Sequence, residues 1–477
     1  MLHGRESFPN TPFPSMSGQA PARDPGYDAA VGDEKSSIFK AYDIRGIYPD
    51  ELNEEIAWRI GHAFVRWLER DRLVMGRDMR TSSPALTEAF ARGASAAGAT
   101  VVDVGLVSTD GLYFASGKLD LPGAMFTASH NPARYNGLKL CREKAAPIGE
   151  ESGLQEIAKL TEDAPADGGG EARTEKLDIL ADYAAHCRSL VDESLFKPLK
   201  VAIDAANGMA GKTVPEVFGS LPFEVFPLYF ELDGTFPNHP ANPIEAENLV
   251  DLQRAVKENG CDVGIAFDGD ADRIFLVDDM ERLVTGSTTT AMVAERLLKR
   301  NPGASILYNL ICSWTVPEVI KENGGKPIRS RVGHSFIKEL MAETGAVFGG
   351  EHSGHYYFKD NFRADSGMIA ALLVLEMMCE AGKPLSELLE PYNRYFDSGE
   401  INSEVADQQG TMKKLAETYS EGKQDWTDGL TVEFEDWWFN CRPSNTEPLL
   451  RLNLEARTER LMEEKRDEVL SIIRGTR

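Results

Sequence analysis

The 477-residue sequence has no long apolar run and far fewer basic than acidic residues. No stretch approaches the roughly 18 consecutive apolar residues that a membrane-spanning helix needs, so we expect no membrane insertion. Lysine and arginine total 51 against 76 aspartates and glutamates, for a formal charge of −25. This charge repels nucleic acid and anionic lipid. Because no local basic patch offsets it, we expect neither as a partner.

Cysteines are few, and their spacing excludes two kinds of site. The six cysteines include no CxxC pair and several lie in apolar surroundings, which predicts buried free thiols rather than a zinc site or a disulfide framework. A reducing cytoplasm is the location we expect. Residues 1–36 lack the apolar core of a signal peptide and are rich in Pro, Gly, Ser and Asp. We therefore expect a disordered N-terminal tail.

A complete nucleotide-binding P-loop is also missing. The segment AANGMAGKT at 205–213 is close to that motif, but Ala206 stands where its first glycine is required. That glycine is part of the backbone cradle for the phosphates. The sequence therefore does not predict a P-loop NTPase.

What the chain does have is a regular alternation of strand-like and helix-like segments up to about residue 395. This alternation is typical of α/β units around mainly parallel sheets. Because a strand, a helix and a second strand recur from residues 73, 199 and 305, we predict three similar domains in tandem. The sequence pattern after about residue 395 predicts two alternating strands around a polar turn, followed by an amphipathic helix. These elements would form a smaller α+β domain. We expect domain I over 37–190, domain II over 191–297, domain III over 298–395 and domain IV over 396–477.

The hexapeptide TASHNP at 127–132 follows a predicted strand. Ligands of open α/β folds commonly bind where strands end, at the carboxyl edge of the sheet. Ser129 has the position of a nucleophile there. Taken alone, however, the segment favours an ordinary turn of Ser, Asn and Pro, so its role depends on the other motifs.

Three aspartates, Asp268, Asp270 and Asp272, stand at alternate positions between two apolar strands. Three carboxylates this close do not all ionise without a neutralising cation, and hard oxygen ligands suit Mg²⁺. An EF-hand is disfavoured, because it needs a glycine where Arg273 stands and helices on both sides. A solvated acidic turn is the alternative, but the flanking apolar strands favour metal binding.

Two further polar segments carry candidate ligands. The segment FGGEHSGHYYF at 348–358 places Glu351, Ser353 and His355 at alternate positions, so an extended chain would direct all three to one side. A carboxylate, a hydroxyl and an imidazole suit a polyol, although a polar loop with one structural histidine is equally consistent. The segment CRPSNTEP at 441–448 joins an arginine to hydroxyl and amide donors, which is typical of a phosphate cradle.

Six segments together resemble the α-D-phosphohexomutase superfamily, and within it the bacterial phosphomannomutase/phosphoglucomutase branch. They occur in the family's order from about residue 38 to the end of the chain: KAYDIRG (40–46), GRDMR (76–80), TASHNP (127–132), DGDADR (268–273), GEHSGH (350–355) and RPSNTEP (442–448). The resemblance implies four domains around a central cleft, three of them α/β domains with mixed sheets and the last a smaller α+β domain. It also implies an isomerase of carbohydrate metabolism that transfers phosphate within the substrate.

The resemblance implies that Ser129 carries the transferable phosphoryl group, and that phosphorylated Ser129 and the three aspartates hold Mg²⁺. The enzyme would pass this phosphate to a hexose 1-phosphate, let the 1,6-bisphosphate reorient, and take back the other phosphate. Glucose or mannose 1,6-bisphosphate would act as the activator. The residues implied in phosphate contact or proton handling are Arg45, His130, Lys139 and Arg273, and those implied in substrate binding are Tyr42, His334, Glu351, Ser353, His355, Arg442, Ser444, Asn445 and Thr446. Lys139 and His355 are the candidates for general acid and base.

Individual residues bear on the substrate. Thr127 and Asn445 differ from the pattern of the sister branch, phosphoglucosamine mutase, and favour mannose and glucose phosphates. Val332 stands where many relatives have threonine, which would remove one hydroxyl contact, and we expect the side chain of His352 to point away from the sugar. The alternatives are phosphoglucosamine mutase, a metal-dependent sugar phosphatase and a non-catalytic binding protein. We expect a monomer or a homodimer.

Overall fold

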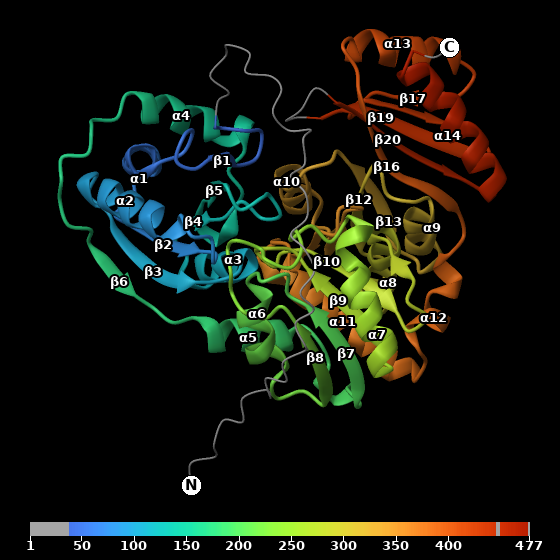
Figure 1. Ribbon diagram of the computed structural model, residues 1–477, viewed down its shortest axis with the longest axis horizontal. Helices are drawn as coiled ribbons and strands as arrows, with labels where there is room; N and C mark the ends of the chain where they lie inside the picture. Colours follow the sequence, from blue (N-terminus) through green and yellow to red (C-terminus); the bar gives the residue numbers. More distant parts are fainter. Residues whose placement is uncertain (1–37, 445–448, 476–477) are drawn as a thin grey trace. The chain divides into compact units, whose positions relative to one another are not determined.

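A computed structural model describes residues 38–444 and 449–475, which form four sheets in succession along the chain (Figure 1). The disorder expected for residues 1–36 concerns a segment outside these ranges, and Asn445 and Thr446 also lie outside them. The three α/β domains with mixed sheets and the C-terminal domain confirm the expected fold class.

The first sheet has the strand order β1-β5-β4-β2-β3-β6. Strands β2, β3, β4 and β6 run parallel, whereas β5 is antiparallel to both β4 and β1. Its elements are β1 (Ile44–Ile47), α1 (Glu54–Leu68), β2 (Arg72–Arg77), α2 (Ser83–Ala96), β3 (Thr100–Leu106), α3 (Thr109–Leu119), β4 (Gly123–Phe126), β5 (Tyr135–Cys141), α4 (Leu154–Glu162) and β6 (Thr174–Lys176).

The second sheet has the order β11-β10-β9-β7-β8 and the third the order β13-β12-β14-β15. Around the second sheet the chain forms α5 (Leu180–Ser189), β7 (Leu199–Asp204), α6 (Ala210–Phe218), β8 (Phe223–Leu228), α7 (Val250–Asn259), β9 (Val263–Phe267), β10 (Ile274–Asp278) and β11 (Leu283–Val284). Around the third it forms α8 (Gly286–Arg300), β12 (Ser305–Asn309), α9 (Thr315–Glu322), β13 (Lys326–Ser330), α10 (His334–Thr344), β14 (Phe348–Gly350), β15 (Tyr356–Phe358), α11 (Gly367–Ala381) and α12 (Leu385–Leu388).

One hairpin recurs in all three sheets. A strand with a parallel neighbour is followed by a polar loop and an antiparallel partner, as in the pairs β4/β5, β9/β10 and β14/β15. The loop in each case leaves the carboxyl end of the first strand, the edge at which α/β sheets present ligand-binding groups. The three predicted motifs of domains I to III occupy this same position.

The apolar core is shared between domains. One cluster of buried side chains draws on the first three sheets and on helices α3, α5, α6, α8 and α11. A second cluster lies between the first sheet and helices α1 and α2, which lie side by side (Figure 1). These two helices approach closely at Gly61 and Gly93, where an added Cβ would lie 2.2 Å from the carbonyl oxygen of Phe90 and 1.9 Å from that of Trp58.

The C-terminal domain has its own core and an antiparallel sheet of order β16-β20-β19-β18-β17. Its elements are β16 (Phe396–Glu404), α13 (Gln408–Thr418), β17 (Lys423–Asp425), β18 (Leu430–Glu433), β19 (Trp437–Pro443), β20 (Leu449–Ala456) and α14 (Glu459–Ile473). The prediction of two strands in residues 429–456 is wrong, because a turn at 434–436 divides the first run into β18 and β19.

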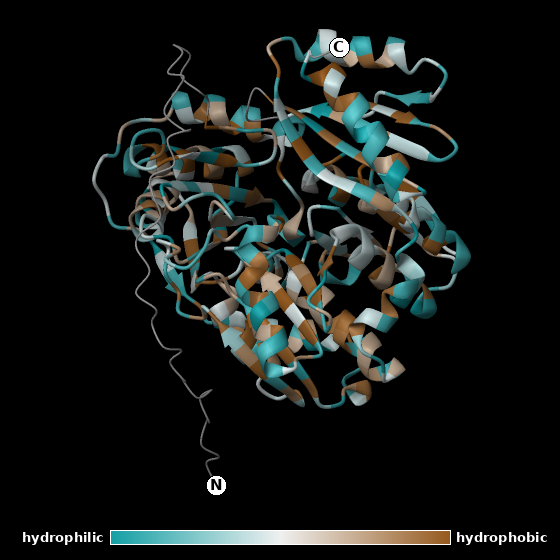
Figure 2. Ribbon diagram, turned by 45° about the vertical axis from the view of Figure 1, so that its right-hand side comes forward, coloured by the Kyte–Doolittle hydropathy of each residue, from teal (hydrophilic) through white to brown (hydrophobic). Residues whose placement is uncertain are grey.

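Helix α14 has the amphipathic character expected from the sequence. Hydrophilic and hydrophobic residues alternate along the helices next to the C terminus (Figure 2), and α14 buries Val469, Leu470 and Ile473 against the sheet. The apolar helix α11 is also 15 residues long, but it is almost entirely buried. Within the described part of the chain, no helix combines the length and apolar character needed to cross a membrane.

Candidate active site

Ser129 lies in the loop between β4 and β5 and is 4% exposed. Its backbone has a φ of 49°, in the left-handed region, which is uncommon for a residue other than glycine. The Ser129 amide donates to Thr127 Oγ1 at 2.9 Å. A sharp backbone turn thus presents the hydroxyl from the end of the strand.

Arg80 holds this loop in place, a role that sequence analysis did not assign although GRDMR belongs to the family pattern. Its guanidinium donates to four loop carbonyl oxygens, those of Ser129 (2.9 Å), Asn131 (2.6 Å), Pro132 (2.9 Å) and Tyr135 (2.9 Å). It also pairs with Asp78 at 3.2 Å, and both side chains are fully buried. No periodicity in the sequence indicates that this side chain turns back onto the loop.

The Ser129 hydroxyl meets the loop of three aspartates between β9 and β10. Its Oγ donates to Asp268 Oδ2 at 2.7 Å and accepts from Arg273 Nη2 at 3.0 Å. This close approach requires glycine at position 269, where an added Cβ would lie 2.5 Å from the Ser129 carbonyl oxygen. The nucleophile candidate and the first aspartate are therefore brought together from segments 139 residues apart.

The three aspartates are buried within one group, and ligand oxygens of all three lie within 4.8 Å of one another. Burial raises the pKa of Asp268 to about 7, although Arg273 opposes the shift. Burial also disfavours the charge on Asp270, but the Lys139 ammonium and the hydrogen bonds from Lys139 and Thr109 outweigh it and lower the pKa of that carboxyl. The strands β9 and β10 that flank this loop exclude an EF-hand.

This group fits a divalent cation. Among the residues that the structure describes, Asp270 Oδ1 and Asp272 Oδ1 are buried oxygens that accept no hydrogen bond, and an unpaired buried carboxylate oxygen is costly. Three clustered carboxylates, two of which have an oxygen that accepts no hydrogen bond, are the kind of donor set that Mg²⁺ prefers. Lys139 Nζ lies 2.8 Å from Asp270 Oδ2 and 2.6 Å from Asp272 Oδ2, on the oxygens opposite the unpaired ones.

Lys139 is itself buried and carries a positive charge. Burial opposes its charge, but Asp270 and Asp272 outweigh that effect and raise the pKa of the ammonium well above its usual range. A lysine in this state is a poor proton acceptor. It supplies positive charge next to the serine and the aspartates.

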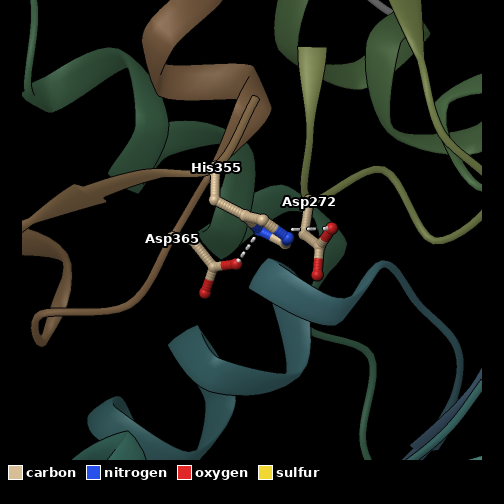
Figure 3. Close-up of side chains that lie close together, drawn as sticks. All are labelled: Asp272, His355 and Asp365. Carbon is tan, nitrogen blue, oxygen red and sulfur yellow. Dashed lines mark hydrogen bonds and ion pairs between the residues drawn. The ribbon is translucent and has the colours of Figure 1, made fainter. Parts of the chain in front are cut away.

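His355 lies between two carboxylates, as Figure 3 shows. Its Nδ1 is 2.8 Å from Asp365 Oδ2 and 3.9 Å from Asp272 Oδ1. Burial lowers the pKa of the imidazole, but these carboxylates outweigh the effect and raise it overall. Asp365 also pairs with the buried Lys338 at 2.9 Å. Neither Asp365 nor Lys338 was predicted from the sequence.

His130 lies in the serine loop, and Arg45 lies next to it. His130 Nδ1 lies 3.2 Å from Ser129 Oγ and accepts a short hydrogen bond from Arg273. Burial and then the neighbouring arginines Arg273 and Arg45 hold the pKa of this imidazole well below its usual range, so it is neutral at pH 7. Arg45 donates to Asn131 and pairs with Asp43. Both predicted residues are thus close to the Ser129 loop.

The loop between β14 and β15, the predicted sugar clamp, differs from the expected geometry. The prediction that residues 351–355 are extended is wrong, because the Gly354 amide bonds to the Glu351 carbonyl oxygen at 3.1 Å and Gly354 has a φ of 86°. The Glu351 carboxylate is buried and accepts from Tyr357 at 2.5 Å and Asn309 at 3.0 Å. Ser353 is half-buried in the same turn.

The other residues of this region singled out from the sequence are His352 in the same loop, Tyr42 and His334. His352 Nδ1 lies 3.0 Å from Ser287 Oγ, whereas His355 Nδ1 bonds to Asp365. Tyr42 of domain I donates to the Val332 carbonyl oxygen at 3.2 Å, which joins KAYDIRG to the segment before α10. His334 is the first residue of α10, and its side chain lies outside what the structure describes.

The predicted phosphate cradle contains a second arginine. Arg442 on β19 and Arg451 on β20 are cross-strand partners, and they hold opposite oxygens of Glu400 at 2.6 and 3.2 Å. Arg451 also donates to Ser444 Oγ at 3.3 Å. Sequence analysis missed Arg451, although its place in the strand after the loop was the available signal. Asn445 and Thr446 lie in the part that is not described.

Comparison with known proteins agrees with this fold and site. Four profiles of the phosphoglucomutase/phosphomannomutase family match in order: alpha/beta/alpha domain I at residues 36–166, domain II at 181–281, domain III at 285–395 and the C-terminal domain at 400–472. A protein described as phosphohexose mutases from Xanthomonas campestris pv. campestris is 42% identical over 443 residues, covering 92% of this chain and 99% of that protein.

A phosphomannomutase from Escherichia coli is 40% identical over 452 residues, again covering 92% of this chain and 99% of the relative. The crystal structure of a phosphoglucomutase/phosphomannomutase family protein from Burkholderia thailandensis superimposes with a TM-score of 0.83 at 34% identity, covering 92% and 97% of the two chains. The fold and site thus define an intramolecular phosphotransferase of the α-D-phosphohexomutase superfamily. The chain belongs to its phosphoglucomutase/phosphomannomutase family.

Proposed function

We propose that the chain interconverts hexose 1-phosphates and hexose 6-phosphates, with mannose and glucose phosphates as substrates, through phosphorylated Ser129 and a hexose 1,6-bisphosphate. The observation that carries the proposal is the setting of Ser129 Oγ, 2.7 Å from Asp268 and 3.0 Å from Arg273. A buried hydroxyl between a carboxylate group and a guanidinium is suited to carrying a phosphoryl group.

The transfer step needs little covalent chemistry from the protein. The bond between Ser129 Oγ and phosphorus breaks, a bond from the sugar hydroxyl oxygen to phosphorus forms, the sugar hydroxyl loses its proton and Ser129 Oγ gains one. Arg273 donates to Ser129 Oγ, so it stabilises the negative charge that develops on this oxygen. In the second half of the cycle the same groups act in reverse on the other phosphate.

His355 is the proton acceptor that we assign. Its Nδ1 bonds to Asp365, which orients the ring and leaves Nε2 as the atom for proton exchange. The raised pKa of the imidazole increases its affinity for a proton. Lys139 is ionised between two aspartates, so we assign it charge neutralisation. The neutral His130 accepts from Arg273 and orients that guanidinium.

Asp268, Asp270 and Asp272 would hold Mg²⁺ together with an oxygen of phosphorylated Ser129. Bound there, the cation would neutralise the charge that spreads over the phosphoryl oxygens during transfer. Asp270 Oδ1 and Asp272 Oδ1, which accept no hydrogen bond from the described residues, support this assignment. Glucose or mannose 1,6-bisphosphate is the activator that we expect, because it regenerates phosphorylated Ser129.

The non-transferred phosphate needs an anchor while the sugar reorients. Arg442, Arg451 and Ser444 would bind it, since two guanidinium groups on adjacent strands match a phosphate dianion. Glu400 keeps both arginines in place. Glu351 and Ser353 would contact the hydroxyl groups of the sugar.

The buried free cysteines support a reducing cytoplasm as the location.

The test supplies mannose 1-phosphate, glucose 1-phosphate and glucosamine 1-phosphate separately, with Mg²⁺ and a trace of glucose 1,6-bisphosphate. Formation of the 6-phosphate and release of free phosphate are followed together. We expect isomerisation of the first two without net phosphate release, and loss of at least 10³-fold in rate for Ser129→Ala, on the order expected when a covalent nucleophile is removed. Stoichiometric phosphate release would instead indicate a phosphatase. Full activity of Ser129→Ala would refute the mechanism.

A further inference from the structure

The first turn of helix α3 contacts the metal-binding loop from another domain. Thr109 is the first residue of this helix and is fully buried. Its Oγ1 donates to Asp270 Oδ2 at 2.5 Å, and its backbone N–H donates to the Asp270 carbonyl oxygen at 3.0 Å. One residue of domain I therefore bonds to both the side chain and the backbone of a residue 161 positions away in domain II.

The position of this turn is fixed by its neighbours. Asp110 accepts hydrogen bonds from Ser108 at 2.5 Å, from Tyr183 at 2.6 Å and from Ser366 at 2.6 Å. Ser366 is the N-cap of α11 in domain III, and Tyr183 lies on α5. The N-terminus of α3 is thereby anchored to two other helices, so Thr109 approaches Asp270 from a fixed direction.

From these contacts we infer that Thr109 is a positioning residue for the cation: its hydroxyl fixes the rotation of the Asp270 carboxylate so that Oδ1 faces the other aspartates. This inference rests on the proposed function, in which Asp270 is a ligand. Two donors, Thr109 and Lys139, both bond to Oδ2, while Oδ1 has no hydrogen-bond partner among the described residues.

Thr109 and Lys139 contribute differently to this arrangement. The Lys139 ammonium is shared between Asp270 and Asp272, so its hydrogen bonds are not specific to one of the two carboxylates. The Thr109 hydroxyl has Asp270 as its carboxylate partner and brings no positive charge, so it orients the carboxylate without competing with a cation. Groups that orient metal ligands in this way commonly change metal affinity by about 10- to 100-fold.

The test is the direct titration of the full-length protein with Mn²⁺, with free Mn²⁺ measured by electron paramagnetic resonance. Thr109→Val keeps the shape of the side chain and removes the hydroxyl, whereas Thr109→Ser keeps the hydroxyl. Thr161→Val is the matched control, because Thr161 is also a buried threonine of domain I but bonds to the backbone of its own helix α4, 2.8 Å from the Ile157 carbonyl oxygen. We expect the Kd for Mn²⁺ to rise about 10- to 100-fold in Thr109→Val.

The Kd of Thr109→Ser for Mn²⁺ should stay within about threefold of the wild-type value, and the Kd of Thr161→Val should equal that value, on the same scale of effects. Raising Mg²⁺ should restore the rate of Thr109→Val, which a general loss of structure would not allow. A wild-type Kd in folded Thr109→Val overturns the inference, and Thr109→Ala serves the same test if the valine variant does not fold. Wild-type Mn²⁺ binding by Asp270→Asn would instead overturn the metal assignment in the proposed function.

Discussion

Replacing Arg80 by methionine tests how the serine loop is held. The substitution preserves most of the side-chain volume but removes the donors to four loop carbonyl oxygens. It also leaves Asp78 buried without its cation, since both side chains are fully buried. The loop carries Ser129, so the change should affect both stability and phosphoryl transfer.

The magnitude follows from the buried ion pair. Removing one partner of such a pair typically costs about 3–5 kcal/mol, because the remaining charge is uncompensated. The four carbonyl oxygens add to this cost where loop movement does not expose them to water. We expect Arg80→Met to lower the free energy of unfolding by at least about 3 kcal/mol, and to lower kcat because Ser129 loses its fixed position.

The assay is urea denaturation, with the shift in midpoint converted through the wild-type slope, together with steady-state kinetics. Arg72→Met is the matched control, since Arg72 forms an ion pair with Glu175 in which the side chains are 49% and 58% exposed; we expect a change below about 1 kcal/mol there. Asp78→Asn combined with Arg80→Met should be less destabilised than the sum of the single variants. A loss below about 1 kcal/mol in Arg80→Met, with unchanged kcat, would refute the reasoning.

Three further predictions concern other parts of the molecule. Burial raises the pKa of Glu455 to about 7 from 4.5. The free energy of unfolding should therefore be highest below pH 4.5, and should fall by up to about 3 kcal/mol as the pH rises to 7, because the unfolded chain loses this proton first. Glu455→Gln should remove this pH-dependent loss in urea denaturation across pH 4.5–8. Gly93→Ala places a Cβ 1.9 Å from the Trp58 carbonyl oxygen and should lower the free energy of unfolding by about 1–3 kcal/mol. Gly170→Ala, whose added Cβ has no atom within 4 Å, should change it by no more than about 0.5 kcal/mol. Equal urea midpoints for the two variants would contradict this prediction. Arg451→Met should lower kcat/KM about 10- to 100-fold, mainly through KM, and the exposed Arg457 on the same domain provides the control variant Arg457→Met.

The local features of the site were predictable from the sequence. Alternating aspartates between apolar strands indicate a cation site because carboxylates so close together need one, and the structure contains those flanking strands as β9 and β10. The recurring strand, helix and strand pattern also predicted the α/β repeat. The error at residues 351–355 has a local cause, since an alternating pattern does not reveal that Gly354 adopts a φ of 86° and closes a turn.

The sequence by itself determined which polar loops follow the buried strands at the sheet edge, and its family motifs single out these loops as the candidates for chemistry. Only the tertiary structure decided which side chains serve those loops. Arg80 turns back onto the Ser129 loop, Thr109 reaches Asp270 from another domain, and Arg451 joins Arg442 across two strands. These contacts depend on how separate sheets pack on a shared core, and sequence spacing carries no record of distances between segments that meet only after folding.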